Sequence, residues 1–155
     1  MELFNNLIFG FGVALSPQNL LFCFFGALVG TLIGVLPGIG PLATLAMLLP
    51  ATFYLPPVPA LIMLAGIYYG AQYGGSTTAI LVNVPGESAS VVTCLDGHQM
   101  ARKGRAGAAL AIAALGSLFA GTVATGIIAV ASPPLSELAL QFLAPEYFSL
   151  MVLGL

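Results

Sequence analysis

One stretch of this chain, residues 106–132, runs for 27 residues without a charged side chain. A helix rises about 1.5 Å per residue and the hydrocarbon core of a bilayer is about 30 Å thick, so such a run is long enough to cross a membrane. The whole chain has the same character, because 5% of its residues are charged and 59% are hydrophobic, against about 25% charged in a soluble domain. We therefore predict an all-α polytopic membrane protein that lies in a lipid bilayer.

Shorter apolar segments precede this run. Residues 3–15 end at Ser16-Pro17 and are too short to span, so we expect an interfacial or re-entrant helix there. The other expected elements are a span over 19–36, a half-helix over 42–54, and a helix from residue 60 to about 73. We expect Gly74-Gly75 to loosen that last helix and Pro85-Gly86 to end it.

The C-terminal part begins with a polar loop, DGHQMARKGRAG at 96–107, which leads into the long apolar run. The final residues, YFSLMVLGL at 147–155, resemble a span that stops after its first turns. We therefore expect residues 1–155 to be the N-terminal transmembrane part of a longer protein, or a truncated copy, that stops within a span.

The few charges of the chain predict its orientation. Arg102, Lys103 and Arg105 are the only cations, and they lie in the polar loop together with Asp96. The positive-inside rule places such a loop in the cytoplasm, so we expect a multi-pass protein of the inner membrane. A net charge of −2 gives no basis for nucleic-acid binding.

Two Gly/Pro breaks interrupt the apolar sequence. Residues 30–41 read GTLIGVLPGIGP, and Pro85-Gly86 forms a second break that is also followed by a short apolar segment. Backbone groups freed by a break cannot stay unpaired in hydrocarbon, so they must face protein, water or a ligand. We interpret the breaks as discontinuous helices that line a binding site, and the alternative is a simple kink or re-entrant turn.

Hydroxyl side chains lie close to the second break. Ser76, Thr77 and Thr78 follow Gly75, and Asn83 precedes Pro85-Gly86. They have the composition of an oxygen cage for Na⁺ or of a donor set for a carboxylate, although serine and threonine also bond back to their own helix. Glu87 is either a proton carrier or a solvated acid at the interface.

Glycines also recur every four residues, at 26, 30, 34 and 38 and again at 66, 70 and 74. Small residues at this spacing lie on one face of a helix and allow two backbones to approach closely. Close helix packing is the simplest interpretation of both stripes. It does not explain why Pro37 and Pro41 flank Gly38-Ile39-Gly40.

Enzymatic chemistry finds little support. GESAS at 86–90 lacks the last glycine of a nucleophile elbow because Ser90 stands there, and His98 is the only histidine. One histidine with Cys23 and Cys94 makes no zinc site, and these cysteines are not expected to pair. We therefore expect neither an enzyme nor a metal centre, and no cofactor beyond a coupling Na⁺ or H⁺.

Taken together, GTLIGVLPGIGP, YYGAQYGGSTTAILVNVPGE and DGHQMARKGRAGAAL resemble the large membrane subunit of the bacterial tripartite tricarboxylate transporters, over roughly residues 19–155. The resemblance implies secondary transport of tricarboxylates or related carboxylates, driven by an ion gradient. It implies as partners a small membrane subunit and a periplasmic solute-binding protein. It also implies two inverted repeats, of which this chain is the first.

The resemblance further implies roles for individual residues. The substrate or ion path would be lined by Gly38, Ile39, Gly40, Gly75, Ser76, Thr77, Thr78, Asn83, Pro85 and Gly86. Family members often carry a small residue at the place of Glu87, so the resemblance does not imply that a proton-carrying role of this acid is essential. The cytoplasmic connector would hold Asp96, Arg102, Lys103 and Arg105. The alternative is a membrane subunit that serves only as a scaffold for assembly, and a channel with a continuous aqueous pore is a third possibility.

Overall fold

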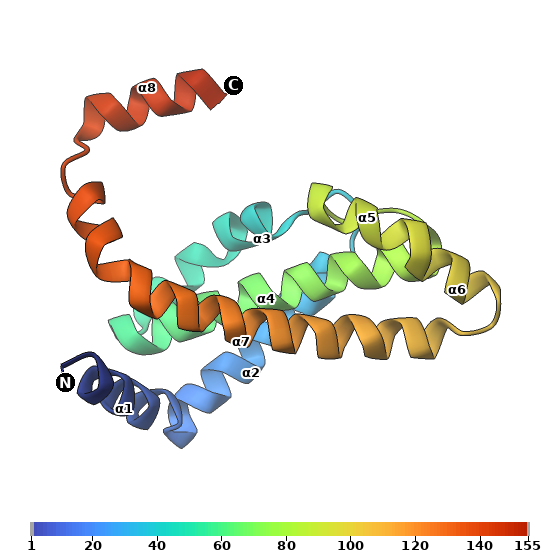
Figure 1. Cartoon of the computed structure of the whole chain (residues 1–155), viewed down its shortest axis with the longest axis horizontal. Helices are drawn as coiled ribbons and strands as arrows, with labels where there is room; N and C mark the ends of the chain where they lie inside the picture. The colour runs from blue at the N-terminus through green and yellow to red at the C-terminus, as the bar shows by residue number, and fades with distance from the viewer. Residues whose placement is uncertain (1, 155) are drawn as a thin grey trace. The chain divides into compact units, whose positions relative to one another are not determined.

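A computed structural model describes residues 2–154, and this part of the chain is built of helices joined by turns, without strands (Figure 1). The protein is thus an all-α membrane protein, as predicted. Two of its helices are long and apolar enough to cross a bilayer, by length and composition: α2 (Pro17–Gly34) and α7 (Ala106–Ala139). The chain divides into two compact units, Met1–Ala113 and Ala114–Leu155.

The first helix, α1 (Glu2–Ala14), coincides with the short apolar segment expected at 3–15. It ends at a turn before Pro17, and the buried Asn19 amide donates to the carbonyl of Val13 over 2.8 Å. The same carbonyl, at the end of α1, also accepts from the N–H of Ser16 over 3.2 Å. The side chain of Asn19 therefore fixes the corner between α1 and α2.

The first break separates α2 from a shorter helix. After Gly34 the chain makes turns, with Gly38 at a left-handed φ of +86°, and α3 (Pro41–Leu48) then begins. The half-helix expected over 42–54 is split, because η1 (Leu49–Tyr54) continues it as a 3₁₀-helix. Pro50 explains the change, since it lacks the N–H that an α-helical bond would need there. That α2 and α3 act as one discontinuous membrane helix stays a prediction.

The expectation that Gly74-Gly75 loosens the next helix is wrong. Helix α4 (Pro57–Val82) runs through both glycines for 26 residues without interruption. Both glycines are buried, and the backbone of α2 or of Gly86 lies against each of them. Packing on these two sides holds the helical conformation that glycine alone disfavours.

The glycine stripes join α2 to α4. A β-carbon added to Gly26, Gly30 or Gly34 would strike the backbone of Met63, Ile67 or Ala71, respectively. In return, a β-carbon on Gly66 would lie 2.6 Å from the carbonyl oxygen of Cys23, and one on Gly74 2.6 Å from that of Thr31. Because the partner numbers rise together, the two helices run parallel. The close-packing interpretation is thus correct for every stripe member except Gly38, which lies outside the helix.

The segment after α4 turns back on that helix. Asn83 caps α4 in the left-handed conformation, with φ 62°, and the chain then becomes helical again from Ser88 to Arg102. Its pieces are η2 (Ser88–Ser90), α5 (Val91–Thr93), the π-helical η3 (Cys94–His98) and α6 (Gln99–Arg102). The loop expected at 96–107 is therefore wrong up to Arg102, because packing of this segment on α4 keeps it helical. The actual turn is centred on Gly104, with φ +75°.

The second unit, considered by itself, holds the C-terminal part of α7 and all of α8 (Ala144–Gly154). Helix α7 does not stop at residue 132 but continues through Pro133 and Pro134 to Ala139. The two prolines remove two backbone donors, and the Ser136 hydroxyl donates to the carbonyl of Pro133 over 2.8 Å. At the start of α8 the carboxylate of Glu146 accepts from the N–H of Leu143 over 2.9 Å.

Candidate substrate and ion site at two helix breaks

The two Gly/Pro breaks meet in space. Gly86, in the second break, is buried against Gly75 of α4, and a β-carbon on Gly86 would lie 2.5 Å from the Cα of Gly75. The same β-carbon would lie 3.4 Å from the carbonyl oxygen of Gly34, where α2 ends. The second break therefore contacts the end of α2, which is the edge of the first break.

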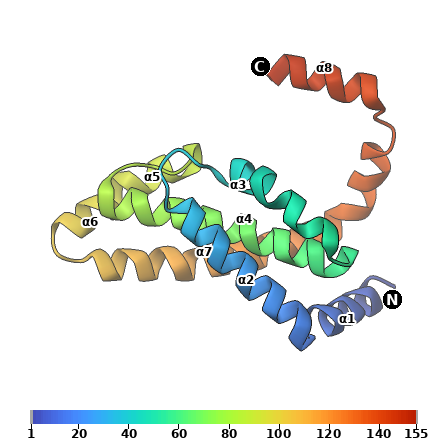
Figure 2. The same ribbon diagram turned by 180° about the vertical axis from the view of Figure 1, so that it is seen from behind.

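A second contact joins the two segments that restart after the breaks. The Cβ of Glu87 lies 3.9 Å from the position of a β-carbon on Gly40, the residue that precedes α3. Figures 1 and 2 show α3 and the helical segment of α5 starting side by side and running in opposite directions. The N-terminal ends of these two helical segments therefore converge.

This meeting point lies well inside the end of α4. Gly75 precedes the last residue of α4, Val82, by seven residues, which corresponds to about 10 Å along the helix. Residues 83–86 run back over this length, and the following helical segment returns until Gly97 and His98 contact Ile80. We call residues 83–98 the returning segment and Gly86-Glu87 its tip.

The start of α3 presents free backbone donors at the meeting point. Pro41 has no N–H, and the carbonyl of Gly40 accepts both the N–H and the hydroxyl of Thr44, each over 3.1 Å. The N–H groups of Leu42 and Ala43 belong to the first turn, which has no intrahelical acceptor. Together with the positive end of the helix dipole they favour a negatively charged group.

The hydroxyl groups near Gly75 differ in what they offer. Thr77 donates to the carbonyl of Tyr73 over 2.9 Å, and Thr78 donates to the carbonyls of Gly74 and Gly75 over 3.3 and 3.0 Å. For these two threonines the back-bonding alternative is correct. Their protons are committed to α4, so their oxygens retain only acceptor capacity, which suits a cation and not a carboxylate.

Ser76 and Asn83 are freer than the two threonines. Ser76 is half-buried, and its hydroxyl makes no side-chain hydrogen bond within residues 2–154. Asn83 is exposed at the left-handed cap of α4, before half-buried Pro85.

Glu87 lies half-buried at the tip, at the start of η2. The hydroxyl of Ser90 donates to the carbonyl of Glu87 over 2.9 Å and accepts from its N–H over 3.2 Å. Ser90, which is 2% exposed, thereby fixes the backbone at the tip. This structural role of Ser90 was not predicted from the sequence, in which the serine only breaks the pattern of a nucleophile elbow.

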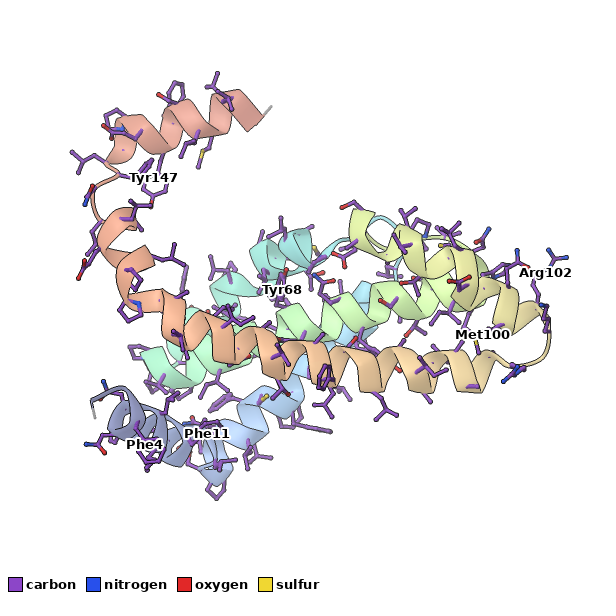
Figure 3. All side chains as sticks on the ribbon, in the orientation of Figure 1. Phe4, Phe11, Tyr68, Met100, Arg102 and Tyr147 are labelled. Carbon is purple, nitrogen blue, oxygen red and sulfur yellow. The ribbon has the colours of Figure 1, made fainter. Side chains whose placement is uncertain are left out.

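The remaining predicted residues lie in different places. Gly38 is exposed, with nothing within 4 Å of its would-be β-carbon, whereas Ile39 is half-buried. The cations of the expected connector are all exposed around the turn at Gly104, and Figure 3 shows Arg102 beside that turn. Asp96 belongs to a separate groove of about 270 Å³, whose lining is Ile80, Val92, Thr93, Asp96, Gly97, Met100, Ala109, Ile112 and Ala113.

Two further polar contacts were missed by the sequence analysis. The amide of Gln72 donates to the hydroxyl of Tyr68 over 3.1 Å, one turn before Ser76 on α4. His98 Nδ1 lies 3.0 Å from the carbonyl oxygen of Ile80. A glutamine within an otherwise apolar helix was a readable signal for the first contact. Nothing in the local sequence indicated the second, because it joins residues 18 positions apart.

The cysteines and acids form no obvious metal centre. Cys23 and Cys94 are free thiols, the first exposed and the second half-buried. Within the described residues 2–154, no group of three or more His, Cys, Asp or Glu side chains is placed to hold a metal ion.

Comparison with known proteins gives the family. Residues 20–155 match the Tripartite tricarboxylate transporter TctA family. A protein of Agrobacterium vitis, described as an uncharacterized 52.8 kDa protein in the TAR-I ttuC' 3'region, is 69% identical over 155 residues. The match covers all of this chain and 31% of that relative, and no solved structure matches. The chain belongs to the tripartite tricarboxylate transporter TctA family.

Proposed function

We propose that this chain contributes one half of the substrate and ion path of an uptake system for tricarboxylates or related carboxylates, driven by an ion gradient. The observation that supports it is the contact between the two breaks, with Gly86 against Gly34 and Gly75 and Glu87 beside Gly40. In a membrane protein, non-helical backbone at depth persists where it lines a cavity or a ligand. Membership of a transporter family gives that ligand its chemical class.

The hydrogen-bond donors of the site suit the carboxylate substrate, and the acceptors suit the coupling cation. The free N–H groups at the start of α3 and the hydroxyl of Ser76 donate to the carboxylate, because a carboxylate only accepts. The coupling cation, Na⁺ or H⁺, faces the hydroxyl oxygens of Thr77 and Thr78 and the freed carbonyls at the breaks. Gly38, Ile39, Gly40, Asn83, Pro85 and Gly86 complete the lining.

The rest of the system supplies what this chain lacks. We infer that a second, inverted repeat contributes the other half of the path, that a small membrane subunit completes the complex, and that a periplasmic binding protein delivers the carboxylate. The chain covers 31% of its Agrobacterium vitis relative, so room for a second repeat exists in that longer protein. The turn at Arg102, Lys103 and Arg105 faces the cytoplasm of an inner-membrane protein.

Carboxylate uptake by the complete complex tests the proposal. Ser76→Ala, Thr77→Ala and Asn83→Ala are compared with Ser117→Ala, which removes an exposed hydroxyl from α7. We expect at least a tenfold rise in KM or a changed ion dependence for one or more of the first three, and no change for Ser117→Ala. Equal expression is checked by immunoblot.

The same experiment separates transport from a scaffold role. A subunit that only supports assembly predicts normal KM and normal ion dependence in all four variants. That result would contradict the proposal that the two breaks line the transport path. A selective effect at Ser76 or Asn83 excludes the scaffold, because neither side chain bonds to another element of the described chain.

A further inference from the structure

The last turn of α4 has carbonyl groups that its own helix cannot satisfy. The carbonyls of Ala79, Ile80, Leu81 and Val82 belong to this turn, which contains no basic residue. His98 Nδ1 lies 3.0 Å from the carbonyl oxygen of Ile80. A carbonyl only accepts, so Nδ1 carries the proton and donates it. The only histidine of the chain is therefore a cap for α4.

The contact lies in a closely packed place. Ile80 is 1% exposed, and a β-carbon on Gly97 would lie 2.8 Å from Cγ1 of Ile80. Gly97 therefore allows the returning segment to approach α4 closely enough for the neighbouring histidine to reach the carbonyl. A buried carbonyl left without a donor is costly, so the imidazole is the group that makes this approach favourable.

The returning segment is thus attached to α4 at two places. At its base, Gly97 and His98 contact Ile80, and at its tip, Gly86 contacts Gly75. The helical residues 88–98 connect the two places as one continuous helical segment. A shift of the base along α4 would move the tip by a similar amount, because a helix transmits displacement along its axis.

We propose that His98 is a positioning residue, whose Nδ1–H anchors the base of the returning segment on Ile80 and thereby sets where the tip Gly86-Glu87 lies against Gly40. The consequence for transport rests on the proposed function, whereas the positioning itself does not. The imidazole touches neither the tip nor the breaks. It acts through the backbone of residues 88–97.

Cross-linking of the tip measures this position directly. Gly40→Cys and Glu87→Cys are introduced into the complete natural polypeptide that contains this chain, after Cys23→Ala and Cys94→Ala. Their β-carbons would lie 3.9 Å apart, which matches the separation of about 3.5–4.5 Å in a disulfide. The rate of disulfide formation with a mild oxidant is then compared among variants at residue 98.

Two amide variants test whether a donor is needed at the place of Nδ1 or whether any polar side chain at position 98 is enough. In His98→Asn the amide nitrogen occupies the place of Nδ1, whereas in His98→Gln it reaches the place of Nε2. We expect His98→Ala and His98→Gln to slow disulfide formation about fivefold, the effect of one lost hydrogen bond, and His98→Asn to restore it. If His98→Ala folds poorly, the comparison of His98→Asn with His98→Gln still shows whether the hydrogen bond from the place of Nδ1 positions the tip.

Equal rates for the histidine protein and His98→Ala, or equal rates for Asn and Gln, would overturn the proposal. The assay needs no substrate, so its outcome is independent of whether the complex transports a carboxylate. Uptake of radiolabelled citrate is measured in parallel as a probe of the proposed function. If a protein with native Gly40 and Glu87 takes up neither citrate nor another carboxylate while the cross-link pattern holds, the proposed function fails and the role of His98 stands.

Discussion

The Cα of Gly75 lies 2.5 Å from the place that a β-carbon on Gly86 would occupy, so no other residue fits at position 86 without movement of the backbone. The neighbouring atoms are main-chain atoms of α4 and α2, which cannot rotate away as the end of a side chain can. The contact therefore fixes the tip of the returning segment at the height of Gly75.

Gly86→Ala is expected to displace the tip. The methyl group would strike Gly75 and approach the carbonyl of Gly34, and overpacking of this kind costs about 1–3 kcal/mol. We expect a lower unfolding temperature in detergent and loss of the Gly40→Cys/Glu87→Cys cross-link. Gly116→Ala serves as the control, because nothing lies within 4 Å of its would-be β-carbon. Equal effects of the two substitutions would contradict the contact.

The parallel packing of α2 and α4 predicts that Gly→Ala substitutions at the helix contact lower stability more than one in α7. Gly30→Ala and Gly70→Ala would each drive a β-carbon into a backbone carbonyl, of Ile67 and Ala27 respectively. We expect each substitution to reduce the free energy of unfolding by about 1–3 kcal/mol. Gly126→Ala in α7 meets nothing within 4 Å and should leave stability almost unchanged. Thermal unfolding in detergent measures all three, and a destabilised Gly126→Ala with normal Gly30→Ala would refute the packing.

Orientation can be tested at the exposed turn. Lys103→Cys, in a protein without Cys23 and Cys94, should react with a membrane-impermeant maleimide only in inverted vesicles or after permeabilisation. The reason is the concentration of all cations at 102–105, which the positive-inside rule assigns to the cytoplasm. Reaction in intact spheroplasts would show that the turn faces the periplasm, which would contradict the predicted orientation.

The threonine hydroxyls give a prediction about the coupling ion. Thr78 is 6% exposed and donates to two carbonyls of its own helix, so its oxygen can only accept. If this oxygen coordinates the cation, Thr78→Ser should keep the ion dependence of uptake, and Thr78→Val should raise the half-saturating ion concentration about tenfold. Uptake measured against ion concentration checks it, and equal curves for Ser and Val would exclude Thr78 as an ion ligand.

Much of the fold could be predicted from the sequence because membrane constraints are local. Long apolar runs located α2 and α7, and the Gly/Pro clusters at 37–41 and 85–86 located the ends of α2 and α4. Two of the wrong expectations share one cause. Gly74-Gly75 and residues 96–102 are helical because another segment packs against them, and a local pattern of glycines or charges does not contain that information.

The candidate site was only partly predictable for a similar reason. Motifs identified the residues of both breaks, but not the contact between Gly40 and Glu87 or the hydrogen bond from His98 to Ile80. These relationships depend on the returning segment reversing after Asn83 by about 10 Å along α4. Helix periodicity and composition describe single elements and not the distance between two of them.

The central claim is that the two breaks meet, and the disulfide between Gly40→Cys and Glu87→Cys tests it most directly. In the complete polypeptide without Cys23 and Cys94, we expect rapid and nearly complete cross-linking, because the two β-carbons would lie 3.9 Å apart. The matched control is Gly12→Cys with Glu87→Cys, since nothing lies within 4 Å of a β-carbon on Gly12. Cross-linking of the first pair alone is the predicted result, and failure of that pair under conditions that oxidise free thiols would contradict the account.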